Sequence, residues 1–132
     1  MPSIPDSHRY LLDSQVATLA TLGPDGRPQQ TVVWFVADGD TIKLSLNTAR
    51  QKTKNLLANP VVDLLILDVN NTQRYLEVRG DATIETDTEY VFADAFIQPK
   101  YGLDARIIDQ PGEERTVVTI NPVRIHAVDM DA

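Results

Sequence analysis

The sequence predicts a mainly β fold, a small antiparallel barrel with short helices, from three observations. Most of the 132 residues fall into segments with the two-residue apolar period of a strand. Short turns rich in Gly, Pro, Asp and Asn join most of these segments, as they do in antiparallel hairpins. Helical periods are confined to short stretches between strands. A small barrel therefore fits the chain better than a sheet of βαβ units.

The first third of the chain predicts a short helix and a hairpin. The helix lies around residues 7–12, and the first strand follows at 16–22, where apolar and small polar residues alternate. The turn Gly-Pro-Asp-Gly at 23–26 carries proline at its second position, where proline is favoured. The second strand follows over residues 28–37, so the two strands are expected to pair.

A third strand is predicted over residues 41–46 and a helix over 49–58. The helix is expected to stop before Pro60, because proline disfavours helix in the residue that precedes it. Thr48, followed three residues later by Gln51, is the capping-box pattern of a helix N-terminus.

The second half of the chain again predicts mostly strand. The expected elements are strands at 61–69, 73–86, 115–120 and 124–130 and a helix at 87–97. Gly80 inside a strand indicates a bulge or a close approach by another group. Residues 98–114 have no clear period.

Composition and charge fit one domain over residues 1–132 and exclude several function classes. The hydrophobic content of 42% is enough for an ordered core. A formal net charge of −7 argues against binding to nucleic acid or to an anionic membrane. The absence of cysteine excludes disulfides and thiolate sites. With no signal-peptide pattern and no apolar run of about 20 residues, a cytoplasmic protein without a membrane span is expected.

Standard phosphate-loop and metal patterns are absent from the sequence. No glycine-rich nucleotide loop occurs. His8 and His126 lie far apart with no second ligand-type residue beside either, so no metal site is expected. Both histidines are interpreted as surface or strand-end residues.

The stretch Asn-Thr-Ala-Arg-Gln-Lys-Thr-Lys-Asn, residues 47–55, places Arg50, Lys52 and Lys54 at the predicted helix start. Cations are unfavourable there because the helix dipole presents its positive end. Two interpretations are open. The cluster is either a solvated helix face, or an anion site in which cations and free N–H groups hold a phosphate.

Over about residues 10–90 the chain resembles the pyridoxamine 5′-phosphate oxidase-like split β-barrel proteins. Within them it is most similar to the short actinobacterial branch that uses the deazaflavin cofactor F420. One motif is Leu-x-Thr-Leu-x-x-Asp-Gly-x-Pro at 19–28. The other is Ser-Leu-Asn-Thr-Ala-Arg-Gln-Lys-Thr-Lys-Asn-Leu at 45–56, followed by Asn-Pro. The order and spacing of the motifs carry the resemblance.

The resemblance implies a six-stranded split barrel that forms a homodimer, with two cofactor sites in grooves at the interface. The residues expected to hold the phosphate of F420, or alternatively of FMN, are Ser45, Asn47, Thr48, Arg50, Lys52 and Lys54. The flavin-type ring is expected along the second strand, at Gln30, Thr31, Val32, Val33 and Trp34. The partner subunit is expected to close the groove near its Arg74, Tyr75 and Arg79. A core or interface aromatic remains an equal interpretation of Trp34.

Two departures from the family pattern bear on function. Pyridoxamine 5′-phosphate oxidases have an additional N-terminal segment and an Arg-Leu-x-Pro-type ending, whereas this sequence ends in Val-Arg-Ile-His-Ala-Val-Asp-Met-Asp-Ala. Oxidation of vitamin B6 is therefore not expected. Val32 stands where some F420-binding relatives carry asparagine, which removes one side-chain contact to the ring.

The activity implied by the resemblance is hydride transfer from reduced F420 to an electron-poor small organic acceptor. Tyr101 or solvent is expected to supply a proton, and residues 98–114 to build the acceptor pocket. Lys43, Arg106 or the partner subunit's Arg79 would meet the glutamate tail of F420. The alternatives are an FMN-binding oxidoreductase of the same fold and a non-catalytic carrier of F420, flavin or a tetrapyrrole.

Overall fold

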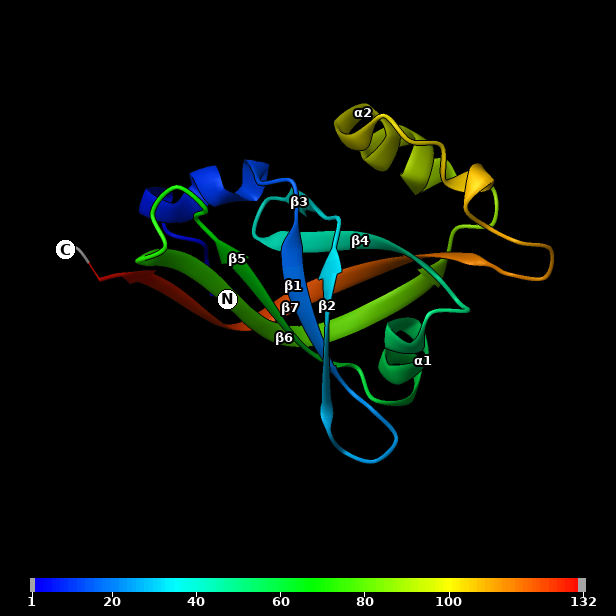
Figure 1. Ribbon diagram of the computed structural model, residues 1–132, viewed down its shortest axis with the longest axis horizontal. Helices are drawn as coiled ribbons and strands as arrows, with labels where there is room; N and C mark the ends of the chain where they lie inside the picture. Colours follow the sequence, from blue (N-terminus) through cyan, green and yellow to red (C-terminus); the bar gives the residue numbers. More distant parts are fainter. Residues whose placement is uncertain (1, 131–132) are drawn as a thin grey trace.

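The computed structural model describes residues 2–130 and confirms the mainly β class (Figure 1). Seven antiparallel strands form a sheet in the order β2-β1-β5-β6-β7-β4-β3. The strands are β1 (Ala17–Leu22), β2 (Pro28–Val33), β3 (Val36–Asp38), β4 (Thr41–Asn47), β5 (Val61–Leu67), β6 (Arg74–Thr86) and β7 (Arg115–Asp129). The helical segments are η1 (Asp6–Asp13), α1 (Gln51–Ala58), η2 (Ala93–Ile97), α2 (Gln98–Tyr101) and η3 (Ala105–Ile107). Within residues 2–130 no helix is long and apolar enough to cross a bilayer.

The sheet curls into a split barrel because its two edge strands are neighbours in the chain. β2 ends at Val33 and β3 begins at Val36, yet they occupy opposite edges of the sheet. Three peptide steps span at most about 11 Å, so Trp34 and Phe35 hold the two edges close together. The strand predicted over 28–37 is therefore broken at this link. The structure has seven strands where the resemblance implied six.

A bulge lets β6 and β7 pair along nearly their whole length. The two C-terminal strands expected from the sequence are one strand, and its register shifts between Arg79 and Gly80, leaving Val123 without an opposite residue. A Cβ added to Gly80 would lie 2.3 Å from the carbonyl oxygen of Asn121. The bulge and the close approach predicted at Gly80 are both confirmed, and they explain how Pro122 is accommodated inside a long strand.

Alternate residues of the strands fill the inside of the barrel. Leu64 and Ile66 of β5 and Leu76 and Val78 of β6 are fully buried, as is Phe35 from the link. The 3₁₀-helix η1 packs against this core through Leu11 and Leu12. His8 of η1 is also buried, and its Nε2 donates to the carbonyl oxygen of Val128 at 2.8 Å. The interpretation of His8 as a surface residue was therefore wrong.

The helix predicted over 87–97 begins and ends later. The Asp87 carboxylate accepts hydrogen bonds from the backbone N–H groups of Phe92 and Ala93, both at 3.1 Å, so Asp87 precedes the first turn. The helix continues through the π-helical turn η2 and α2 to Gly102, whose φ of 69° is left-handed. In Figure 1, α1 and α2 lie at the end of the molecule away from the C-terminus.

Candidate functional site

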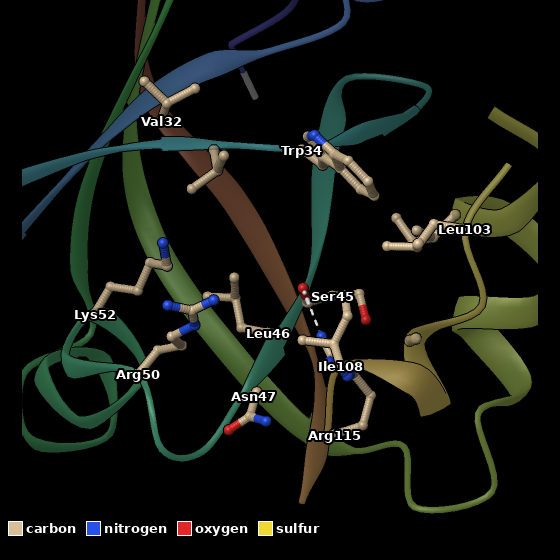
Figure 2. Close-up of a pocket in the computed structure, with 13 residues that line it drawn as sticks. Val32, Trp34, Ser45, Leu46, Asn47, Arg50, Lys52, Leu103, Ile108 and Arg115 are labelled. Carbon is tan, nitrogen blue, oxygen red and sulfur yellow. Dashed lines mark hydrogen bonds between the residues drawn. The ribbon is translucent and has the colours of Figure 1, made fainter. Parts of the chain in front are cut away.

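A cavity of about 220 Å³ opens beside the split in the barrel (Figure 2). β2 and the link after it form one side, β4 and the start of α1 form the floor and a second side, and the segment between η2 and β7 forms the rest. The lining residues are Val32, Val33, Trp34, Ser45, Leu46, Asn47, Arg50, Lys52, Ile97, Leu103, Ala105, Ile108 and Arg115. Seven of them belong to the site predicted from the sequence, and two elements expected to share a cofactor, β2 and the strand-to-helix segment, do meet here.

Arg50 and Lys52 form the cationic edge of the cavity. The Lys52 ammonium donates to the Thr31 hydroxyl at 3.2 Å, which places Thr31 beside the edge. Burial, and then the charge of Arg50, lower the pKa of Lys52 below its ordinary value. Neither cation lies within ion-pair distance of a carboxylate among residues 2–130. Two adjacent positive charges that form no ion pair are an arrangement that a bound anion would stabilise.

The cationic edge is built by Asn47 rather than by the predicted capping box. The Thr48 hydroxyl accepts from the backbone N–H of Glu114 at 3.0 Å, and Gln51 donates to Asn55 at 2.8 Å, so no reciprocal cap forms. The capping-box prediction was wrong because Thr48 is engaged by a distant segment. Instead Asn47 Oδ1 accepts from the backbone N–H of Ala49 at 2.6 Å.

This local structure places Arg50 at the N-cap of α1 and Lys52 in its first turn. The Thr53 hydroxyl donates to the carbonyl oxygen of Asn47 at 2.7 Å, which anchors the helix to the end of β4. Asn55 is buried and donates to Thr21 of β1 at 3.0 Å, which fixes the helix against the hairpin. The two cations therefore project from a helix start that is held on both sides.

Trp34, Ile97, Leu103, Ala105 and Ile108 form the apolar wall of the cavity. In Figure 2, Leu103 and Ile108 lie across the pocket from Arg50 and Lys52. The Trp34 ring stacks on the Tyr101 ring with centroids 4.2 Å apart and an interplanar angle of 2°. One face of the indole is thus used within the chain. Trp34 remains 40% exposed, which leaves it available to a planar ligand.

The Tyr101 hydroxyl is turned toward backbone groups and not toward the cavity. It accepts from the N–H of Phe35 at 3.0 Å and lies 2.7 Å from the carbonyl oxygen of Gln15. Burial raises the pKa of Tyr101 above its ordinary value. Tyr101 is not among the lining residues, so these contacts argue against it as the proton donor expected from the sequence.

Arg115 is a buried member of the cavity lining that sequence reasoning missed. Its guanidinium forms an ion pair with the buried Asp109 carboxylate and donates to the carbonyl oxygen of Ser45 at 3.3 Å. The hydroxyl oxygen of Ser45 is itself buried and has no hydrogen-bond partner among the described residues. Asp109 and Arg115 lie in and just after the stretch without a clear period, so no sequence signal linked them to the site.

Several predicted residues lie elsewhere in the chain. Lys54 lines a separate groove between the β1–β2 turn and α1. Arg74 pairs with Asp129 at 2.6 Å and donates to the carbonyl oxygen of Ser7 at 2.8 Å. The remaining predicted residues outside the cavity lining are Gln30, Thr31, Thr48, Tyr75 and Arg79. Arg74, Tyr75 and Arg79 thus lie outside the cavity of their own chain, and their contribution from a partner subunit stays a prediction.

Comparisons with known proteins agree with this architecture. An F420 reductase of known structure superimposes with a TM-score of 0.79 at 32% identity, over 93% of this chain and 98% of that chain. A conserved hypothetical protein from Mycobacterium tuberculosis matches with a TM-score of 0.76 at 24% identity, over 96% and 86% of the two chains. HupZ from Group A Streptococcus matches with a TM-score of 0.75 at 22% identity, over 96% and 95%. The last two likenesses show the fold alone.

The comparison with curated proteins gives no match. The model of the family described as pyridoxamine 5′-phosphate oxidase matches residues 4–129, which is nearly the whole chain. This family match, the split barrel and the 32% identity to an F420 reductase lead to one conclusion. The chain belongs to the pyridoxamine 5′-phosphate oxidase family.

Proposed function

We propose that this protein is an F420-dependent oxidoreductase that reduces an electron-poor small organic acceptor. The proposal rests on one observation: the cationic edge (Arg50 and Lys52) and the apolar wall line the same cavity. A phosphorylated cofactor with a planar ring needs both surfaces, one for its phosphate and one for its ring. The 32% identity to an F420 reductase supports F420 as the cofactor.

The residues of the cavity fit such a cofactor. Arg50 and Lys52 would hold the phosphate, because each offers charged donors and neither forms an ion pair with a carboxylate of residues 2–130. The ring would lie along the end of β2, at Thr31 to Val33, and beside Trp34 of the link that follows. The unpartnered Ser45 hydroxyl would meet a polar atom of the cofactor or of the acceptor. When bound, reduced F420 supplies a hydride.

The remaining tasks of the chain are to bind, to orient and to exclude water. Among the lining residues there is no histidine, aspartate or glutamate, and Lys52, with its lowered pKa, is the lining side chain of a type used in acid–base catalysis. The apolar wall excludes water from the region where a ring and an acceptor would meet. A proton for the reduced acceptor is then expected from solvent.

A homodimer is part of the proposal, with residues 1–132 as one domain of a cytoplasmic protein. A cavity of about 220 Å³ is small for a complete dinucleotide-sized cofactor, so a second surface is needed. The outward side of the sheet exposes apolar residues, and such a patch marks an interaction surface. Its exposed members include Val32 of β2 and Val61, Leu65 and Leu67 of β5. Pairing there would allow Arg74, Tyr75 and Arg79 of the partner subunit to approach the cavity.

An FMN-binding oxidoreductase is the second candidate. The family match favours it, because the family is described as pyridoxamine 5′-phosphate oxidase, and the cationic edge suits the phosphate of FMN equally well. A carrier that binds F420 without turnover is the third candidate, since the cavity lining contains no histidine, aspartate or glutamate.

The proposal is tested by titrating the purified protein with F420 and with FMN, followed by fluorescence and gel filtration. We expect saturable F420 binding by a dimer, and oxidation of reduced F420 when enones or quinones are added. Retention of FMN without binding of F420 would overturn the choice of cofactor. Binding of reduced F420 without oxidation by any acceptor would favour the carrier.

A further inference from the structure

The segment of residues 102–114 carries part of the apolar wall and has a glycine in the left-handed region near each end. Gly102 and Gly112 both have positive φ, 69° and 87°. Between them, Leu103, Ala105 and Ile108 face the cavity. The segment buries little apolar surface of its own, since Ile107 is 72% exposed and Ile108 40%. Polar contacts must therefore hold it in place.

At the surface, Arg106 pairs with Asp94 of η2, and on the buried side the Asp109 carboxylate is the centre of the contacts. Its side chain is only 4% exposed and accepts from three residues. Arg115 donates through Nε at 3.1 Å and also forms the close ion pair. Asn47 Nδ2 donates at 2.7 Å and the Tyr90 hydroxyl at 2.8 Å. Burial opposes ionisation, but the hydrogen bonds from Arg115, Asn47 and Tyr90 outweigh it and hold the pKa of Asp109 below its ordinary value.

Asn47 connects this carboxylate to the cationic edge. Its Nδ2 donates to Asp109 and, at 3.0 Å, to Glu113, while its Oδ1 accepts from the N–H of Ala49. Both ends of the amide are therefore fixed. The backbone N–H of Arg50 also donates to the carbonyl oxygen of Asn47, at 3.1 Å. Any change in how Asp109 holds Asn47 alters the short loop that presents Arg50.

We propose that Asp109 is a positioning residue that couples the cationic edge to the apolar wall. Because Asp109 belongs to the 102–114 segment, its side-chain contacts hold that segment in place. Its contact with Asn47 orients the short loop that presents Arg50. An anion bound at the edge and a ligand seated on the wall then favour each other's binding, and this coupling is reciprocal. The inference rests on the proposed function only in that the bound anion is the cofactor phosphate.

The test uses the full chain with the isosteric substitution Asp109→Asn. The new amide keeps one acceptor oxygen, whereas the carboxylate uses Oδ1 for Asn47 and Arg115 and Oδ2 for Arg115 and Tyr90. Asp109→Asn therefore removes the negative charge and the acceptor at one of these two positions while the volume is kept. Asp104→Asn is the matched control, because Asp104 lies in the same segment and pairs with Arg106 at the surface. Tyr90→Phe removes a single donor to Asp109 and serves as a milder variant if Asp109→Asn does not fold.

Hydrogen exchange of residues 102–114 and affinity for F420, FMN and pyrophosphate are measured for each protein. In Asp109→Asn we expect exchange in this segment to be about tenfold faster or more, and affinity to be about tenfold weaker or more, from the loss of charged hydrogen bonds. Saturating ligand should slow exchange of the segment in the wild type and in Asp104→Asn, and not in Asp109→Asn. Tyr90→Phe should show a smaller change of the same kind.

Unchanged affinity in Asp109→Asn, or equal ligand-induced protection in all four proteins, would overturn the coupling. Failure of the wild type to bind any of the three probes would overturn it as well. A wild type that binds pyrophosphate but neither F420 nor FMN would overturn the proposed function alone, because the coupling is still measured with pyrophosphate.

Discussion

Replacing Lys52 by methionine separates a binding role from a structural one. Methionine keeps most of the aliphatic stem and removes the charge. In the free protein the Lys52 ammonium makes one side-chain hydrogen bond, to Thr31 at 3.2 Å, while burial and the neighbouring Arg50 lower its pKa. Its charge is therefore unfavourable before a ligand binds. We expect the free energy of unfolding of Lys52→Met to stay within about 0.5 kcal/mol of the wild type or to rise.

Cofactor affinity should respond in the opposite direction. A hydrogen bond to a charged group contributes about 1.5–3 kcal/mol, which corresponds to a loss of about 10- to 150-fold in affinity. Fluorescence titration with F420 measures the affinity, and urea denaturation measures the stability. Arg27→Ala is the matched control, because the Arg27 guanidinium also forms no ion pair with a carboxylate among residues 2–130 but lies outside the cavity. Equal losses of stability and affinity in Lys52→Met would refute the reasoning.

Three further predictions concern Lys54, Gly80 and Asp63. Lys54→Ala should weaken F420 binding less than Lys52→Met does, because Lys54 lines the neighbouring groove. The same fluorescence titration compares the two variants, and a larger loss in Lys54→Ala would indicate that the phosphate binds in that groove. Gly80→Ala should lower the free energy of unfolding by about 2–4 kcal/mol in urea denaturation, since its Cβ would meet the Asn121 carbonyl; an unchanged midpoint would contradict the bulge. Burial and a hydrogen bond with Glu77 raise the pKa of Asp63 to about 6, so its proton is lost first in the unfolded chain. The contribution of Asp63 to stability should therefore fall as pH rises from about 4 to about 6. Asp63→Asn should make the thermal unfolding temperature depend less on pH over that interval, and an unchanged pH dependence would contradict the raised pKa.

The strands were predictable because their signal is local. The two-residue apolar period of the sequence predicts alternating burial, as observed for Leu64 and Ile66 of β5. Gly80 was interpretable for the same reason, since only glycine tolerates so close an approach by another backbone. The break between β2 and β3 was not predictable, because Trp34 and Phe35 continue the apolar run of β2 in the sequence. They form a link between two strands only because the sheet curls and brings its two edges together.

The site was predictable only in part, because tertiary contacts decide it. Arg50 and Lys52 stood out as cations at a helix start, whereas the capping box failed since Thr48 is bonded by Glu114, 66 residues away. Asp109 and Arg115 gave no signal at all. Their chemistry depends on burial against Asn47, which no local pattern records.

A crystal structure of the protein with bound F420 tests the central claim most directly. We expect the cofactor phosphate to contact Arg50 and Lys52 and the ring to lie along β2 against Trp34. A phosphate located in the groove beside Lys54, or a ring placed away from β2, would contradict it.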